Sequence, residues 1–259
     1  MEIYDGRSLL IYLAVKYEGD YDKICNAIVL REDPGYEEVM RVNKSLTCKT
    51  ITLLDYDYPL KLKQVMRPPF VLFYYGDITL LDRPMLAVVG SRLTTAYGRF
   101  CTDKVLSEMI QGRVLISGLA RGIDSIAHEC ALKYGAKTIA VLGTAINKCY
   151  PPENKELYET IKKDHLLISE YPPNAEPNPS HFPMRNRIVI SLADGVYIPQ
   201  INNYMSGTMI SVTIAANTGK QVFVAPDRID SNTINNQLID EGATFTIDGE
   251  TILTMMKWK

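Results

Sequence analysis

From Met85 onward, short apolar runs alternate with longer segments in which apolar residues recur every three or four positions. The short runs predict strands at residues 85–89, 114–117, 138–142, 165–170, 195–198 and 221–225. The longer segments predict helices at residues 97–111, 123–134, 153–163, 185–193, 206–218 and 233–241. This alternation predicts the α/β class, with a doubly wound, Rossmann-like, mainly parallel sheet and helices on both faces. Right-handed crossovers then place the strand-to-helix turns at one edge, where such sheets bind ligands.

The first fifty residues follow a different pattern. Helical spacing occurs at residues 7–17, 21–30 and 36–43, and strand-like runs come only at 50–54 and 71–75. We therefore predict a small helical domain over residues 1–60 and a Rossmann-like domain over residues 66–250. The helical domain either stabilises or positions the second domain, or it contacts the ligand directly. Residues 171–184 hold five prolines and predict a loop within the second domain.

Two of the ligand-edge turns carry residues suited to phosphate. The turn after strand 114–117 holds two glycines and one arginine just before a helix, and the turn after strand 85–89 reads Gly-Ser-Arg. Free N–H groups at a helix N-terminus favour anions, and arginine binds phosphate with two parallel hydrogen bonds. The alternative role for each arginine is an ordinary surface salt bridge. The candidate contacts in these turns are Gly90, Ser91, Arg92, Gly118, Arg121 and Gly122.

Three later segments add candidates. Lys148 is the one base in the turn after strand 138–142, and residues 182–187 read Phe-Pro-Met-Arg-Asn-Arg. Arginines two apart on a helix point to different faces, so we expect one of them to meet a ligand directly. Aromatic rings near phosphate contacts can stack on bases, although Phe182 fits a core position equally well and Tyr171 is a second platform. The additional candidates are Lys148, Phe182, Arg185, Asn186, Arg187, Ser206 and Gly207.

The sequence shows no catalytic or metal-binding constellation. Asp124 and Ser125 stand where side chains cap a helix, and His128 suits packing or hydrogen bonding better than catalysis. The three histidines lack metal-ligand spacing, and the five cysteines form no Cys-x-x-Cys pair. Neither the dinucleotide-binding pattern Gly-x-Gly-x-x-Gly nor the phosphate-binding P-loop pattern occurs. We therefore predict no catalytic residue, no metal and no cofactor.

Composition narrows the class of protein. The chain has 259 residues, of which 46% are hydrophobic and 22% charged, as in soluble globular proteins. No apolar run approaches the roughly 20 residues that cross a bilayer, and residues 1–5 are acidic where a secretion signal is basic, so we expect a cytoplasmic protein without membrane contact. Residues 83–187 carry 14 Lys and Arg against 10 Asp and Glu, whereas residues 188–259 carry 4 against 7. This asymmetry favours a focused anion site within a net charge of −2.

Five sequence blocks stand in order between residues 85 and 243. They are Gly90-Ser91-Arg92 with Thr95 and Tyr97-Gly98, Ser-Gly-Leu-Ala-Arg-Gly-Ile-Asp-Ser-Ile-Ala-His at 117–128, Thr-Ile-Ala-Val-Leu-Gly-Thr at 138–144, Tyr150-Pro151 with Asn154, and His-Phe-Pro-Met-Arg-Asn-Arg at 181–187. Together they resemble the DprA (Smf) family of DNA-processing proteins. The sequence departs from the family pattern at Pro152, Pro199-Gln200 and Pro226-Asp227, where relatives place lysine, an acidic residue and Pro-Gly.

The resemblance implies a protein that is not an enzyme. It would bind single-stranded DNA through the candidate residues above and load the RecA recombinase during natural transformation. It also implies a small helical, SAM-like module at the N-terminus and a homodimer, whose interface and recombinase contact we place after residue 188. Two other functions stay open: a nucleotide-sensing protein, and an enzyme that cleaves the glycosidic bond of nucleoside monophosphates. Such an enzyme needs a paired acid beside Gly207-Thr208, where this sequence continues Met-Ile-Ser-Val.

Overall fold

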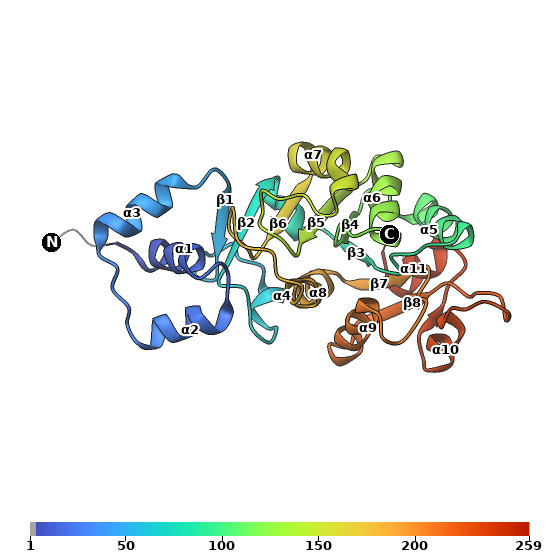
Figure 1. Cartoon of the computed structure of the whole chain (residues 1–259). Helices are drawn as coiled ribbons and strands as arrows, with labels where there is room; N and C mark the ends of the chain where they lie inside the picture. Colours follow the sequence, from blue (N-terminus) through green and yellow to red (C-terminus); the bar gives the residue numbers. More distant parts are fainter. Residues whose placement is uncertain (1–3, 259) are drawn as a thin grey trace.

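The computed structural model describes residues 4–258, which contain one nine-stranded sheet that crosses the centre and right of the view in Figure 1. Its strands are β1 (Lys49–Thr52), β2 (Val71–Gly76), β3 (Met85–Val88), β4 (Val114–Ser117), β5 (Lys137–Leu142), β6 (Leu166–Ser169), β7 (Gly195–Ile198), β8 (Gln221–Val224) and β9 (Thr244–Phe245). They are ordered β1-β2-β6-β5-β4-β3-β7-β8-β9, and all neighbours from β6 to β9 in this order are parallel. β1 and β2 pair antiparallel with each other, and β2 pairs antiparallel with β6. The predicted doubly wound, mainly parallel sheet is confirmed.

Helices cover both faces because successive residues of a strand point to opposite sides of the sheet. In β3, Met85 and Ala87 belong to the hydrophobic core on one face, whereas Leu86 and Val88 belong to the core on the other. The first face is covered by α4 (Leu60–Lys63), α8 (His181–Leu192), α9 (Gly207–Asn217) and α10 (Asn235–Asp240). The second is covered by α5 (Ala96–Met109), α6 (Ile123–Lys133), α7 (Lys155–Asp164) and α11 (Gly249–Met255).

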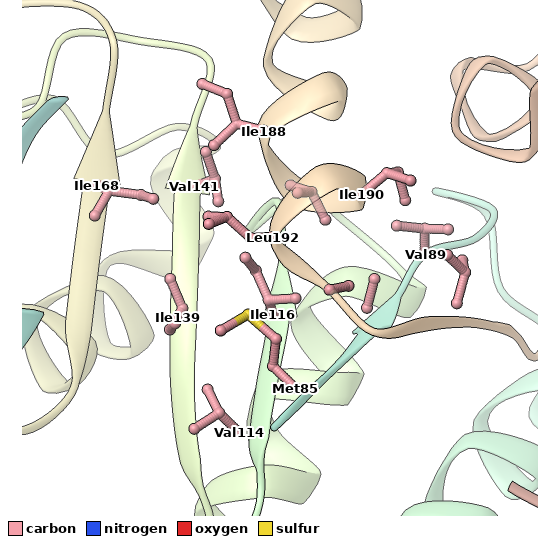
Figure 2. Packing of buried hydrophobic residues seen from close by; sticks show 14 of the residues in the cluster. Met85, Val89, Val114, Ile116, Ile139, Val141, Ile168, Ile188, Ile190 and Leu192 are labelled. Atoms are coloured by element: carbon pink, nitrogen blue, oxygen red, sulfur yellow. The ribbon is translucent and has the colours of Figure 1, made fainter. Parts of the chain in front are cut away.

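Helix α8 is fixed to the sheet by a continuous apolar core. Figure 2 shows Ile188 and Leu192 of this helix beside Val141 of β5, Ile116 of β4 and Met85 of β3. All five side chains are at most 1% exposed. Burial of such side chains stabilises the fold by about 1.5–3 kcal/mol each. The core therefore holds the first turn of α8 in a defined place at the ligand edge.

The predicted N-terminal helices form at one end of the sheet, next to β1 and β2 (Figure 1). They are α1 (Gly6–Lys16), α2 (Tyr21–Val29) and α3 (Tyr36–Ser45), and the side chains of Asp5 and Asp20 cap the first two. The sheet already begins at Lys49, so β1 falls inside the first predicted domain, and the division at residues 60 and 66 stays a prediction. Residues 1–3, which belong to the acidic segment from which we predict that there is no secretion signal, lie outside the described residues.

The sheet has a topological switch point at β3. The chain builds β4, β5 and β6 on one side of β3 and then crosses through α8 to place β7, β8 and β9 on the other. In such sheets the turns at the switch point diverge and leave a crevice for a ligand. Helix α8 begins at His181, four residues before the predicted start, and Pro183 lies in its first turn, where proline is tolerated. The predicted loop over residues 171–184 is therefore wrong at residues 181–184, which are helical. The two-residue β9 and the short α11 were not predicted.

Candidate nucleic-acid interface

A cavity of about 710 Å³ opens at the switch point. The turns after β3 and β4, the loop from β7 into α9, and the first turns of α8 and α9 line it. A smaller hollow of about 30 Å³ lies beside it and shares Arg92, Phe182 and Arg185 with the larger cavity. The carboxyl edge of the sheet is thus hollowed where a doubly wound fold binds its ligands.

The turn after β3 is held rigidly by its neighbours. A Cβ on Gly90 would lie 2.6 Å from Cγ1 of Ile123, so close packing requires glycine there. The N–H of Ser91 donates to the carbonyl of Gln200 at 2.9 Å, and its hydroxyl accepts the N–H of Asn202 at 2.9 Å. Gly90 and Ser91 therefore fix the backbone from which the next side chain projects.

That side chain, Arg92, is exposed and forms no ion pair within residues 4–258. Its guanidinium lies 5.9 Å from the centre of the Phe182 ring, and that ring lies 5.3 Å from the ring of Tyr150. Phe182 is half-buried and Tyr150 is 47% exposed. An unpaired guanidinium beside two accessible rings offers both a phosphate contact and a stacking surface for bases.

The turn between β4 and α6 adds a second, partly neutralised arginine. Leu119 and Gly122 have φ values of 58° and 75°, and Asn154 holds the turn by donating from Nδ2 to the carbonyl of Leu119 at 3.0 Å. Arg121 is exposed but forms an ion pair with Glu153, which raises the pKa of Arg121 and lowers that of Glu153. A phosphate at Arg121 has to compete with this carboxylate.

Arg185 of α8 supplies a third positive charge beneath the turn. It is only 4% exposed, and it donates to the carbonyls of Gly118 and Val141 and, from Nε, to Oδ1 of Asn186 at 3.1 Å. A Cβ on Gly118 would overlap with the guanidinium, so this position requires glycine. Burial lowers the pKa of Arg185 and raises that of Asp124, which lines the same cavity. Because an arginine remains protonated, the wall carries a fixed positive charge.

The other arginine of the block, Arg187, is engaged elsewhere. It donates to the carbonyl of Arg67 at 3.0 and 3.1 Å and to that of Met184 at 2.9 Å, and it forms an ion pair with Glu170 at 2.6 Å. Burial raises the pKa of Glu170, although the ion pair opposes this effect. The structure therefore brings Arg185 to the cavity and uses Arg187 to hold the core together.

The structure brings most of the predicted site residues together. The cavity and the adjoining hollow are lined by Gly90, Ser91, Arg92, Gly118, Arg121, Phe182, Arg185, Asn186, Ser206 and Gly207. Within the described chain, three other candidates line neither space: Gly122, Lys148 and Arg187. Gly122 packs against the backbone of Ser91 and Arg92, and Lys148 is exposed while its carbonyl accepts from Thr144.

Two aromatic side chains have structural roles. Tyr171 is 4% exposed, and its ring stacks on His181 with centres 3.7 Å apart, so it offers no platform for a base. His128 is fully buried, and its Nδ1 lies 2.7 Å from Oγ1 of Thr138, in the hydrogen-bonding role that the sequence favoured. Burial lowers the pKa of His128 to about 3.

The expectation that Asp124 or Ser125 caps α6 is wrong. The N-cap residue is Gly122, and no side chain of residues 4–258 caps it. Asp124 Oδ2 instead accepts the N–H of Ala120 at 3.4 Å, and Ser125 donates to the carbonyl of Gly122 at 3.0 Å. The left-handed turn at Gly122 places both side chains past the position from which a cap acts.

Sequence reasoning missed several lining residues. Tyr150 belongs to the Tyr150-Pro151 block, from which no role could be inferred, and Asn202 and Met205 follow β7 in a loop without a motif. Ser211 lies four residues after Gly207 on α9, so helical spacing alone could have placed it on the same face. Asp124 also lines the cavity, although its position before an apolar run had predicted a helix cap instead.

Within residues 4–258, no group of histidine, cysteine, aspartate and glutamate side chains could hold a metal ion. No helix in this range is long and apolar enough to span a bilayer.

The sheet and its site define the class: a Rossmann-like protein with a cationic, aromatic cavity at the switch point. A family profile described as DNA recombination-mediator protein A matches residues 49–257. The chain belongs to this family, and the DprA (Smf) resemblance is confirmed. The match extends from β1 to the residues just beyond α11.

Curated relatives agree with this assignment. DNA processing protein DprA of Streptococcus pneumoniae is 40% identical over 206 residues, which cover 79% of this chain and 73% of the relative. The Bacillus subtilis protein of the same name is 37% identical over 195 residues, covering 74% and 65% of the two chains. Protein Smf of Escherichia coli is 33% identical over 209 residues, covering 78% of this chain and 54% of the relative.

Two solved structures share the fold. DprA of Streptococcus pneumoniae superimposes with a TM-score of 0.80 and 33% identity, covering 96% of this chain and 93% of the other. DNA processing protein A of Helicobacter pylori gives a TM-score of 0.72 and 31% identity, covering 82% and 97%. The second structure is described by its single-stranded DNA binding mode.

Proposed function

We propose that this protein binds single-stranded DNA in the switch-point cavity and passes it to the RecA recombinase. The observation that carries the proposal is the convergence of three arginines from separate elements beside two accessible rings, namely Arg92, Arg121, Arg185, Phe182 and Tyr150. Guanidinium–phosphate bonds are strong and indifferent to base identity, and every base has a face that can stack. Membership of a recombination-mediator family and the DNA-binding relative support the same ligand.

A single strand fits this site better than a duplex. The arginines and rings lie around a recess between turns, so a ligand must present a phosphate and a base to the same wall. In a duplex the base faces are stacked inside and only their edges reach the grooves. An unpaired strand can turn its bases outward and meet both kinds of group.

We infer that the site binds without breaking bonds. Asp124 is the one carboxylate that lines the larger cavity within residues 4–258, and its pKa is raised by burial. Cleavage of a glycosidic bond usually employs two carboxyl groups on opposite sides of the scissile bond. The Met-Ile that follows Gly207-Thr208 supplies no second acid.

Pairing of two copies and the recombinase contact are proposed for the segment after residue 188. This segment is acidic, with 4 Lys and Arg against 7 Asp and Glu, and it exposes the apolar side chains Ile229, Phe245, Ile247 and Met255. Like patches usually meet in symmetric dimers. Sedimentation of the full chain tests the dimer, and a monomer at high micromolar concentration contradicts it.

The test of ligand class uses fluorescence anisotropy with a labelled oligothymidylate, a duplex of equal length, and thermal shift with nucleoside monophosphates. The single strand should bind more tightly than the duplex, with no base released from any mononucleotide. Stronger stabilisation by mononucleotides than by the oligonucleotide supports the nucleotide sensor. Release of free base would instead establish the enzyme.

A further inference from the structure

The turn between α1 and α2 packs closely against the segment that follows β6. Its glycine, Gly19, has a φ of 77°, and a Cβ at this position would lie 2.6 Å from the carbonyl oxygen of Glu170 and 3.2 Å from Cδ1 of Tyr171. Glycine adopts such a φ freely and has no side chain to prevent the approach. Gly19 therefore brings the N-terminal helices into direct contact with Tyr171.

Tyr171 in turn contacts the start of α8. Its ring is buried and stacks on the ring of His181, the first residue of α8, with centres 3.7 Å apart and planes at 12°. Nδ1 of His181 is buried and has no hydrogen-bond partner among the described residues. Burial lowers the pKa of His181, although the carboxylates of Glu18 and Asp20 oppose this effect, so the ring is uncharged at neutral pH. In this contact His181 therefore acts as a flat, neutral ring.

The next residue of α8, Phe182, forms an aromatic wall of the cavity. Its ring packs over Gly143, where a Cβ would lie 2.8 Å from Cδ1 of Phe182, and it lies beside the guanidinium of Arg92. His181 and Phe182 are neighbours in the first turn of α8, so a shift of the His181 ring moves the backbone that carries the Phe182 ring. The position of the wall therefore depends on the stacked pair.

A second set of contacts joins the N-terminal helices to α8. Asp22 forms an ion pair with Arg67 at 3.1 Å, and the Arg67 guanidinium lies 5.6 Å from the centre of the Tyr21 ring. The carbonyl of Arg67 accepts two hydrogen bonds from Arg187 of α8. Among residues 4–258, those that line the cavity and the adjoining hollow all follow residue 88. The N-terminal helices thus reach the cavity through α8 and not through side chains of their own.

We propose that the N-terminal helices position the aromatic wall of the DNA site through the stacked pair of Tyr171 and His181. Gly19 and this pair are positioning residues, and Phe182 is the residue that meets a base. This inference rests on the proposed function and selects one of the roles that the sequence left open for the N-terminal helices. The arginine turns after β3 and β4 lie outside this chain of contacts. Disturbing the stack should therefore weaken contacts with bases and preserve contacts with phosphates.

The test compares the affinity for a labelled oligothymidylate with that for an abasic strand of equal length, which keeps the phosphates and lacks the bases. The ratio of the two affinities measures the contribution of base stacking. In His181→Ala this ratio should fall about fivefold, while the abasic strand and the salt slope should behave as in the parent. His181→Phe restores a stacked ring and removes an unpaired buried nitrogen, so it should return the parental ratio.

Gly19→Ala tests the contribution of the N-terminal helices. Its methyl group overlaps with the carbonyl of Glu170 and moves the turn away from Tyr171, so the ratio should fall as it does in His181→Ala. Gly35→Ala is the matched control, because Gly35 has a φ of 82° and a Cβ there would meet no described atom within 4 Å. Both alanines have a strained backbone, so both variants should melt earlier, but Gly35→Ala should keep the parental ratio.

A parental ratio in either His181→Ala or Gly19→Ala overturns the positioning role and leaves the proposed function intact. The same conclusion follows from an equal fall of the ratio in Gly35→Ala, or from a His181→Phe variant that behaves as His181→Ala does. A parent that binds no single strand overturns the proposed function itself.

Discussion

Replacement of Arg92 by alanine should weaken binding of single-stranded DNA without affecting the fold. The side chain is exposed and has no ion-pair partner within residues 4–258, so its removal leaves no buried group unpaired. Surface substitutions of this kind change the free energy of unfolding by less than about 0.5 kcal/mol. The loss of a hydrogen bond to a charged phosphate, in contrast, costs about 1.5–3 kcal/mol. This corresponds to a dissociation constant higher by about ten- to one-hundred-fold.

The sharpest comparison is with Arg187→Ala, which removes an arginine from the same sequence block. Arg187 is paired with Glu170, and the two side chains are 10% and 8% exposed, so its removal leaves a buried carboxylate alone. Breaking such a pair destabilises a protein by about 3–5 kcal/mol. For a chain of this size the melting temperature should fall by roughly 10 °C. Arg92→Ala should therefore lose affinity at constant stability, and Arg187→Ala should lose stability first.

The measurement is anisotropy of a labelled oligothymidylate at several salt concentrations, together with thermal denaturation of each variant. Arg92→Ala should also reduce the slope of log affinity against log salt by about 0.7, the value for one phosphate of a single strand. Lys257 at the C-terminal end is the control, and its replacement by alanine should change neither quantity. Parental affinity and slope in Arg92→Ala would show that the cavity is not the DNA site.

Two other contacts of the site and one buried histidine beneath it can be tested in the same way. Glu153→Gln frees Arg121 from its ion pair, so single-strand affinity should rise severalfold, and an unchanged anisotropy titration contradicts the role of Arg121. Gly118→Ala drives a methyl group into the Arg185 guanidinium and should lower affinity at least tenfold; tight binding in this variant would show that the Arg185 position is unimportant. Burial holds the pKa of His128 near 3 in the folded protein, against an ordinary value of 6.5, so the unfolded chain binds more protons as the pH falls. The stability that neutral His128 contributes is complete above pH 6.5 and is lost towards pH 3 by about 1.4 kcal/mol per pH unit, so chemical denaturation of His128→Gln should show a flatter acid limb than the parent.

The fold was predictable because it depends on periodicity. Strands β4 and β7 were located to the residue, since each is a fully buried run that begins after a charged residue and ends before a glycine or a proline. Where the pattern is too short to show a period, as in β9, prediction failed. Pairing of β2 with β6 was also beyond the sequence, because Phe73 and its partner Ser169 are far apart in the chain.

The site was predictable in chemistry and less so in geometry. Two arginines in one block have the same chemistry, and only the tertiary contacts show that Arg185 faces the cavity while Arg187 is paired with Glu170. Likewise Tyr171 and Tyr150 are both tyrosines next to proline turns. Tyr171 is buried and cannot contact a ligand, whereas Tyr150 is accessible. Such differences arise from packing between elements, which a linear pattern does not contain.

The switch point at β3 also determines when the cavity is completed during synthesis. Leu86 of β3 pairs with Leu115 of β4, made soon afterwards, and with Gly195 of β7, made only after the long crossover through α8. The Arg92 and Arg121 turns thus leave the ribosome well before the wall that faces them. Contacts between distant parts of a chain form late, and domains complete their folding as units. A nascent chain that lacks α9 would therefore display its arginines without the wall that faces them, so the complete recess forms only after α9 has been made.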